Sequence, residues 1–215
     1  METKVFTERI ERARKVMERK ELDLCILTNR SSIRYFSGLR MNTAAFSILL
    51  ISQDDIKYLV ARLDLLRAER DCWINDIISF PEDTPDYLNI LNDHFKQWKN
   101  PRVGVELPEL NYETYRYFQE KLSNGHFINI AAELKYLRTI KSDEEIKIIR
   151  ESANIADKAM REALKVAKAG IKEYEVTAVA RYTLLKKVQK ILHLSLFLPQ
   201  GKTAGCLKDI HLKRY

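Results

Sequence analysis

The 215-residue chain contains few of the residues that make flexible linkers, with only six glycines and five prolines. Long disordered connections are therefore not expected. No run of about 18 apolar residues occurs, which is the length that a membrane-spanning helix needs. The opening METKVFTERIERARKVM also lacks the apolar stretch of a signal peptide. These absences predict a soluble, cytoplasmic protein without a membrane partner.

Cysteine is equally scarce. Cys25, Cys72 and Cys206 are widely separated and form no CxxC pair. This spacing favours a reducing compartment and gives no sign of a zinc site. Cys25 lies inside the apolar stretch LDLCILT, which predicts a small buried side chain rather than a nucleophile.

The formal net charge of +7 is concentrated at one end of the chain. The segment 188–215 holds five basic residues and one acid, which gives +4 and leaves +3 for the segment 1–187. The excess of basic residues is thus partly a property of the last segment. No nucleic-acid partner is expected from it.

Strand and helix patterns alternate over the segment 1–132, which predicts an α/β fold with a mixed sheet flanked by helices. The turn-rich stretch NRSSIRYFSGLRM at 29–41 is expected to be irregular, and two aspartates before residue 56 predict an antiparallel hairpin. Expected strands are 23–28, 44–52, 56–61, 76–81, 102–107 and 126–134, and expected helices are 6–22, 62–71, 84–99 and 111–123.

After residue 137 the pattern becomes purely helical. Ser142 and Glu145 form a capping box before a long amphipathic segment, and Gly170 ends it. A second amphipathic helix is predicted over 172–187. Because two helices cannot close a core, we expect them to expose an apolar stripe unless something packs on it.

Three stretches together resemble one known family. They are LRTIKSDEEIKIIRESANIADKAM at 137–160, AGIKEYEVTAVARYTLLKK at 169–187, and the upstream NRSSIRYFSGLR. Their order is similar to the creatinase/prolidase/Xaa-Pro aminopeptidase family. The resemblance implies a creatinase/prolidase-like N-terminal domain at 1–132. It further implies a linker and the first helices of an incomplete pita-bread α+β domain at 133–187.

What the family does is implied by the same resemblance. Its intact members are hydrolases that use two divalent ions, usually manganese, cobalt or zinc, to cleave the bond before proline. Their five metal ligands, two Asp, one His and two Glu, lie downstream of the two helices seen here. We therefore expect this chain to bind no metal and to be inactive alone. In the intact enzyme the expected partners are proline-containing peptides and a second subunit.

In that family the N-terminal domain reaches over the active site of a partner subunit and restricts substrate length. The corresponding residues here would come from the SSIRYFSGLR stretch and from the segment after KYLVA. For Tyr35 and Phe36 the alternative is simple packing under the turn. For Arg62 and Asp64 the alternative is a solvated ion pair. The candidate rim residues are Arg34, Tyr35, Phe36, Ser37, Arg40, Arg62 and Asp64.

The segment 188–215 departs from the family pattern. Read from the third base of each codon, it permits the sequence GAEDIAFEPILASGENGW, which resembles the family's continuation in order and spacing. We interpret this segment as an aberrant, frameshifted tail. A genuinely divergent end and a membrane-surface helix are the alternatives, although Leu192, Leu194, Leu196 and Leu198 alternate like a strand rather than a helix.

A second function class stays open. Peptidase-like domains without metal ligands can bind peptides or proteins instead of cutting them. The segment 1–187 carries no acidic or basic tract suited to histone-type partners. A non-catalytic binding module is therefore the alternative to a peptidase fragment.

Overall fold

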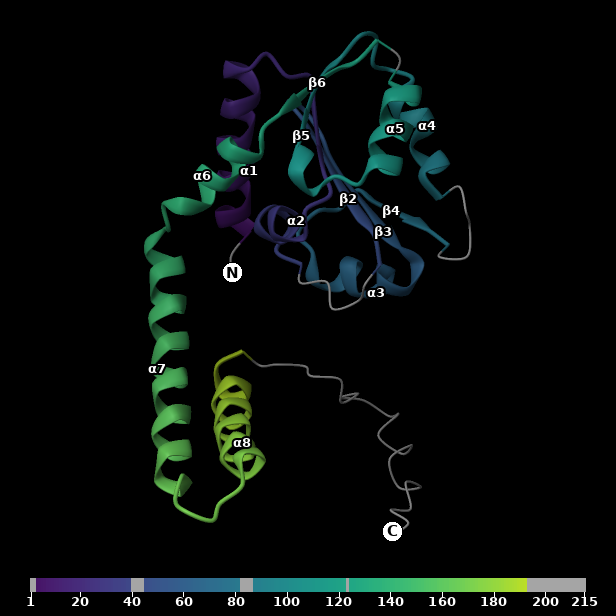
Figure 1. Cartoon of the computed structure of the whole chain (residues 1–215). Coiled ribbons are helices and arrows are strands. Elements are labelled where there is room, and N and C mark those ends of the chain that lie inside the picture. Colours follow the sequence, from purple (N-terminus) through teal and green to yellow (C-terminus); the bar gives the residue numbers. More distant parts are fainter. Residues whose placement is uncertain (1–2, 40–44, 82–86, 123, 193–215) are drawn as a thin grey trace. The chain divides into compact units, whose positions relative to one another are not determined.

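The computed structural model describes residues 3–39, 45–81, 87–122 and 124–192. The chain divides into two compact units, Met1–Ile140 and Lys141–Tyr215, and each is described by itself. Figure 1 shows a sheet with helices in the first unit and a helical hairpin in the second.

The first unit is built on a mixed six-stranded sheet with the strand order β4-β3-β2-β1-β5-β6. The central strand β1 runs antiparallel to β2 and parallel to β5. Strands β2 and β3 form the antiparallel hairpin expected from the two aspartates between them. The strands are β1 (Leu24–Leu27), β2 (Ser47–Ser52), β3 (Ile56–Ala61), β4 (Ile77–Phe80), β5 (Arg102–Val105) and β6 (His126–Asn129).

Alternate side chains of the central strands enter two hydrophobic clusters, one on each face of the sheet. On β1, Cys25 and Leu27 belong to one cluster, whereas Leu24 and Ile26 belong to the other. Burial on both faces explains why these strands read as continuous apolar runs. The predicted α/β class with a mixed sheet between helices is confirmed.

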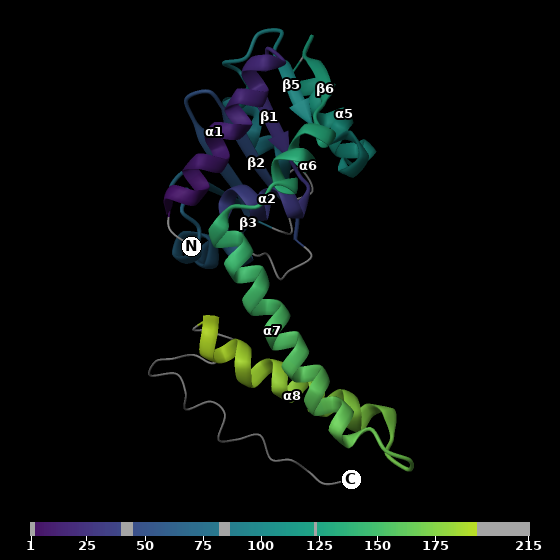
Figure 2. The same cartoon turned by 90° about the vertical axis from the view of Figure 1, so that its left-hand side faces the viewer.

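Four helices supply side chains to the cluster that contains Cys25. Two of them, α1 and α6, contact each other, and Figures 1 and 2 show both on the same side of the sheet. Lys20, directly after α1, pairs with Glu133 of α6 at 2.6 Å. The four are α1 (Thr3–Arg19), α2 (Arg30–Ser37), α3 (Arg62–Asp71) and α6 (Ala131–Thr139). The opposite face packs against η1 (Tyr87–Leu91), α4 (Asn92–Phe95) and α5 (Tyr112–Lys121), and a short η2 (Leu107–Glu109) precedes α5.

The stretch 29–41, expected to be irregular, instead contains helix α2. Asn29 caps its start by accepting hydrogen bonds from the amides of Ser31 and Ser32 at 2.7 and 3.2 Å. Gly38 ends it in the left-handed region at φ 76°. A Cβ at this glycine would lie 2.5 Å from Cζ of Phe6, so the position suits glycine for two reasons.

Two other predictions were partly wrong. The expected strand 126–134 ends at Asn129, and its last part forms the start of α6. The expected helix 84–99 begins outside the described residues and is then divided between η1 and α4. At 126–134 a short apolar run is compatible with either a strand or a helix, and tertiary packing decides between them.

The second unit is a hairpin of α7 (Asp143–Val166) and α8 (Glu173–Leu192). The predicted capping box is confirmed, since the Ser142 amide donates to Glu145 at 2.7 Å and the Glu145 amide donates to Ser142 Oγ at 3.3 Å. Gly170 lies in the turn at φ 86°. Helix α8 continues past Lys187, where the sequence predicted its end.

The two helices bury little between them. On α7 only Ile155, Ala159 and Ala163 are buried. Large apolar side chains remain exposed on both helices, as expected from the sequence. No helix in the described part of the chain has the length and hydropathy needed to cross a bilayer. The interpreted tail from residue 193 onward lies outside the described residues.

Candidate functional site

Tyr35, one of the predicted rim residues, contacts both α1 and α6. The Arg9 guanidinium lies 4.2 Å from the centre of its ring and donates to its carbonyl oxygen at 2.6 Å. Arg12 donates to the Tyr35 hydroxyl at 2.6 Å, and that hydroxyl donates to the Leu137 carbonyl at 3.2 Å. These contacts fix the ring in place.

Two further candidates on α2 are fully buried. Phe36 belongs to the core, and its carbonyl accepts from the Trp73 indole at 2.7 Å. Ser37 Oγ accepts from the Leu39 amide at 3.1 Å, and the Ser37 carbonyl accepts from Cys72 Sγ at 3.4 Å. Both residues therefore join the end of α2 to the segment after α3.

The remaining candidates differ in exposure. Arg34 on α2 and Arg62 at the start of α3 are exposed. Asp64, two residues further along α3, is buried. Arg40 lies outside the described residues. The described part of the predicted rim thus presents two guanidinium groups to solvent and keeps its other members at least half covered.

A buried polar cluster that sequence reasoning missed lies beside these residues. Ser32 Oγ donates to Glu106 Oε1 at 2.6 Å and accepts from Arg138 Nη1 at 2.6 Å. Ser32 and Glu106 are both almost completely buried. The cluster links α2, the end of β5 and α6, because all three follow parallel strands whose carboxyl ends meet at one edge of the sheet.

The electrostatics of Glu106 are unusual for a glutamate. Burial raises its pKa above the ordinary value, while the Ser32 hydrogen bond and the Arg138 charge oppose that shift. Its second oxygen, Oε2, is buried and has no hydrogen-bond partner among the described residues. The hydroxyl of Ser32 is committed to Glu106, so the cluster positions α2 and α6 rather than presenting a free nucleophile.

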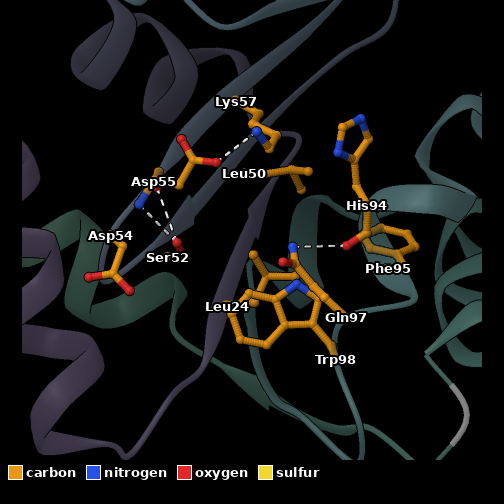
Figure 3. A pocket seen from close by; sticks show the side chains of 10 residues that line it. All are labelled: Leu24, Leu50, Ser52, Asp54, Asp55, Lys57, His94, Phe95, Gln97 and Trp98. Atoms are coloured by element: carbon orange, nitrogen blue, oxygen red, sulfur yellow. Dashed lines mark hydrogen bonds and ion pairs between the residues drawn. The ribbon is translucent and has the colours of Figure 1, made fainter.

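A pocket lies on the face of the sheet that packs against α4, between that helix and the β2–β3 turn (Figure 3). Its volume of about 160 Å³ is below the range of about 300–1,000 Å³ usual for ligand sites. The pocket is lined by both polar and apolar side chains. The lining residues are Leu24, Leu50, Ser52, Asp54, Asp55, Lys57, His94, Phe95, Gln97 and Trp98.

Charges at this pocket are mostly paired with one another. Lys57 contacts Asp55 at 2.7 Å and also pairs with Asp76. The hydrogen bond from Lys57 holds the pKa of Asp55 below its usual range. Gln97 donates to the His94 carbonyl at 3.1 Å. None of the predicted rim residues lines this pocket.

Within the ranges that the structure describes, no three His, Cys, Asp or Glu side chains come close enough to form a metal site. The two-metal chemistry implied by the resemblance is therefore assigned to none of these residues.

Comparison with known proteins identifies the family of this α/β sheet domain and its helical hairpin. Residues 9–140 match the Creatinase/Prolidase N-terminal domain, which is more than half of the chain. The chain belongs to the creatinase/prolidase family.

Individual relatives agree with this assignment. The chain is 27% identical over 177 residues to the Xaa-Pro dipeptidase of Pyrococcus furiosus, covering 82% of this chain and 48% of that protein. It is 24% identical over 188 residues to a creatinase of a Bacillus species, covering 86% and 46%. The solved Xaa-Pro dipeptidase of Bacillus anthracis superposes with a TM-score of 0.67 at 27% identity, covering 85% and 49%. The chain thus spans about half the length of the relatives it matches.

Proposed function

We propose that this chain is the N-terminal part of a metal-dependent peptidase that cleaves the bond before proline in cytoplasmic peptides. The observation that supports this is the extent of the similarity to a relative named Xaa-Pro dipeptidase. The aligned 177 residues exceed the length of the matched N-terminal domain at 9–140, so the similarity continues into the helical hairpin. The hairpin carries the stretches at 137–160 and 169–187 that resemble the start of the catalytic domain.

The reaction itself is assigned to a catalytic half that follows this hairpin in the relatives. Two divalent ions held in that half, of manganese, cobalt or zinc, would supply a hydroxide near neutral pH and Lewis-acid stabilisation of developing negative charge. This chain alone is proposed to have no hydrolytic activity.

For the N-terminal domain we propose a role in restricting substrates at the active site of a partner subunit in a homodimer. Arg34 and Arg62 are the exposed members of the predicted rim. A guanidinium group pairs well with a carboxylate, because its planar donors match the two oxygens. The two arginines are therefore suited to contact the carboxyl end of a short peptide. Phe36, Ser37 and Asp64 are buried, so we assign them a packing role below the exposed arginines rather than contact with substrate.

The test compares two forms of the gene. The unaltered chain, assayed on an Xaa-Pro dipeptide with added manganese, is expected to show no turnover. Insertion of one base at codon 187 moves translation into the alternative frame, and the product is expected to gain manganese-dependent cleavage. Turnover by the unaltered chain contradicts the proposed inactivity. A restored frame without any Asp, Asp, His, Glu, Glu series contradicts the peptidase assignment.

The rim is tested in the restored enzyme. Arg34→Ala and Arg62→Ala are expected to raise KM for the dipeptide about tenfold each, which corresponds to about 1.4 kcal/mol, with little change in kcat. Arg116→Ala is the matched control, because Arg116 is an exposed arginine that pairs with Glu120 on α5. An equal KM for all three variants contradicts the role of the rim.

A further inference from the structure

The pocket shown in Figure 3 lies at the end of the sheet opposite to the predicted rim. Leu24 begins β1 and Ser52 ends β2, and both line the pocket. Strands β1 and β3 run in the same direction, since each is antiparallel to β2. The rim residues Arg34 and Arg62 follow the other ends of β1 and β3. A ligand in this pocket is therefore independent of the proposed substrate contacts and of the peptidase assignment.

Two segments that are far apart in the chain form the polar part of this pocket. The β2–β3 turn contributes Asp54 and Asp55, and the segment from α4 onward contributes His94, Gln97 and Trp98 (Figure 3). The fold of the sheet unit brings the two segments together, so the pocket is not the product of one local turn. Acidic groups from one segment thus share a cavity with an aromatic ring from the other.

The carboxylate of Asp54 has no partner. Asp55 pairs with Lys57 at 2.7 Å, and Lys57 also pairs with Asp76. Asp54 makes no hydrogen bond or ion pair with any residue that the structure describes. Two carboxylates and one ammonium group line the pocket, which gives a net charge of −1 with histidine counted as neutral. The negative charge of Asp54 is available to a ligand.

Basic residues around the pocket do not cancel this charge. Arg14 pairs with Glu11 at 2.9 Å, and Lys96 pairs with Asp93 at 2.5 Å. Lys99 is exposed, and it does not line the pocket. A cation is therefore the class of ligand that the charges favour.

Trp98 supplies the surface on which a planar cation can stack. Within the described part of the chain, its indole Nε1 has no hydrogen-bond partner and its ring contacts no cation or other ring. Tryptophan is the aromatic residue that binds cations best. Elsewhere in this unit the Arg9 guanidinium lies 4.2 Å from the centre of the Tyr35 ring. A guanidinium group is planar, is weakly hydrated and matches both oxygens of a carboxylate, so Trp98 and Asp54 together suit it better than an ammonium group.

The volume of the pocket limits the size of the ligand. A water molecule occupies about 30 Å³ of the liquid, so a pocket of about 160 Å³ holds roughly five non-hydrogen atoms. A guanidinium group with one attached carbon has that size. We propose that this pocket binds a monosubstituted guanidinium group, which stacks on the Trp98 indole and pairs with the Asp54 carboxylate. Small free guanidines and the arginine side chains of peptides both carry this group.

The test is a titration of the full, isotope-labelled chain with methylguanidinium chloride at constant ionic strength, followed by the indole N–H signals in NMR spectra. The chain has only two tryptophans, and Trp98→Phe assigns their signals. The Trp98 signal is expected to shift saturably with a Kd of about 1 mM. The Trp73 signal is expected to stay unchanged, because its indole donates to the Phe36 carbonyl in the other hydrophobic cluster.

Methylurea is the matched control ligand, because it has the same shape and size but no charge. It is expected to shift neither signal. An unchanged Trp98 signal with methylguanidinium, equal shifts of both tryptophans, or an equal response to methylurea overturns the proposal.

Asp54→Asn tests the contribution of the carboxylate. This variant is expected to weaken the binding of methylguanidinium about tenfold or more. Asp93→Asn is the matched control, because it removes an exposed carboxylate that does not line the pocket, and it is expected to keep the parent Kd. An unchanged Trp73 signal shows that each variant is folded. An equal Kd for Asp54→Asn and the parent chain overturns the pairing with Asp54.

Two further ligands identify the group and its source. Methylammonium is expected to bind about tenfold more weakly than methylguanidinium, and equal binding overturns the choice of a guanidinium group. Arginine blocked at both its amino and carboxyl ends represents an arginine within a peptide. Its binding as tightly as methylguanidinium assigns the pocket to arginine side chains, whereas binding about tenfold weaker assigns it to small free guanidines.

Discussion

The two units of the chain differ in how far they bury their apolar side chains. In the sheet unit, a six-stranded sheet is covered on both faces, and each face has its own hydrophobic cluster. In the hairpin, α7 buries only three residues, and large apolar side chains stay exposed. Regular helices with good caps can thus form where no closed core exists. Stability in the first unit comes from burial, and in the second it depends more on capping and helix propensity.

The largest expected effect of a substitution lies in the sheet unit. Phe36→Ala removes a completely buried ring and is expected to lower the free energy of unfolding of this unit by about 3–5 kcal/mol. Urea unfolding followed by tryptophan fluorescence measures this unit alone, because Trp73 and Trp98 both lie in it.

The comparison is completed by Ile155→Ala in the hairpin. This variant is expected to leave the fluorescence transition unchanged and to alter only the circular dichroism signal, since the residue lies in the second unit. A shift of the tryptophan transition by Ile155→Ala shows that the two units unfold together and removes the distinction drawn above.

A smaller effect is expected from the buried carboxyl group. Because burial raises the pKa of Glu106, the folded chain retains the proton to higher pH than the unfolded chain does. The contribution of this group to stability is therefore greatest at low pH and falls as pH rises from the ordinary pKa near 4.5 through the raised value. Glu106→Gln keeps a side-chain oxygen for Ser32, so it is expected to gain stability over the parent chain as pH rises.

The measurement is urea unfolding at several pH values. Glu113→Gln, at an exposed glutamate on α5, is the control and is expected to follow the parent chain. If the free energy of unfolding of Glu106→Gln differs from that of the parent chain by the same amount at every pH, the carboxyl group titrates normally. The cluster then contributes no pH dependence to stability.

The smallest effect is expected at the start of α7. Ser142→Ala removes the capping box and is expected to lower the stability of the hairpin by about 1 kcal/mol, with no effect on the sheet unit. Hydrogen exchange of the first turn of α7 measures it. Ser152→Ala, where the hydroxyl donates to the Ile148 carbonyl within the helix, serves as the control and should change little. Equal exchange in both variants argues against a dominant role for the cap.

Local patterns predicted much of the fold but not the contacts between distant residues. The strands at 56–61 and 102–105, the helix at 62–71 and the polar caps at Asn111 and Ser142 follow from short-range signals. The helix at 30–37 replaces the expected turn although Asn29 and Gly38 mark its ends, because a run rich in polar residues is typical of turns as well.

The candidate site could be predicted only in part. Arg34 and Arg62 could be named from resemblance, but their exposure and the burial of Phe36 required the folded chain. Ser32, Glu106 and Arg138 form one hydrogen-bonded cluster although 74 and 106 residues separate Ser32 from its partners. The hydrophobic periodicity within one helix or strand does not predict which distant residues will come into contact.

The position of β1 in the sheet has a consequence for the order of folding. Its antiparallel neighbour β2 is the next strand along the chain, so this pairing closes a short loop. Its parallel neighbour β5 comes much later in the chain, since Leu24 pairs with Val103. During synthesis the sheet can therefore grow from β1 toward β4 while the other edge of β1 stays open. Until residues 102–105 emerge, that edge is the place where the growing chain is most exposed to wrong partners.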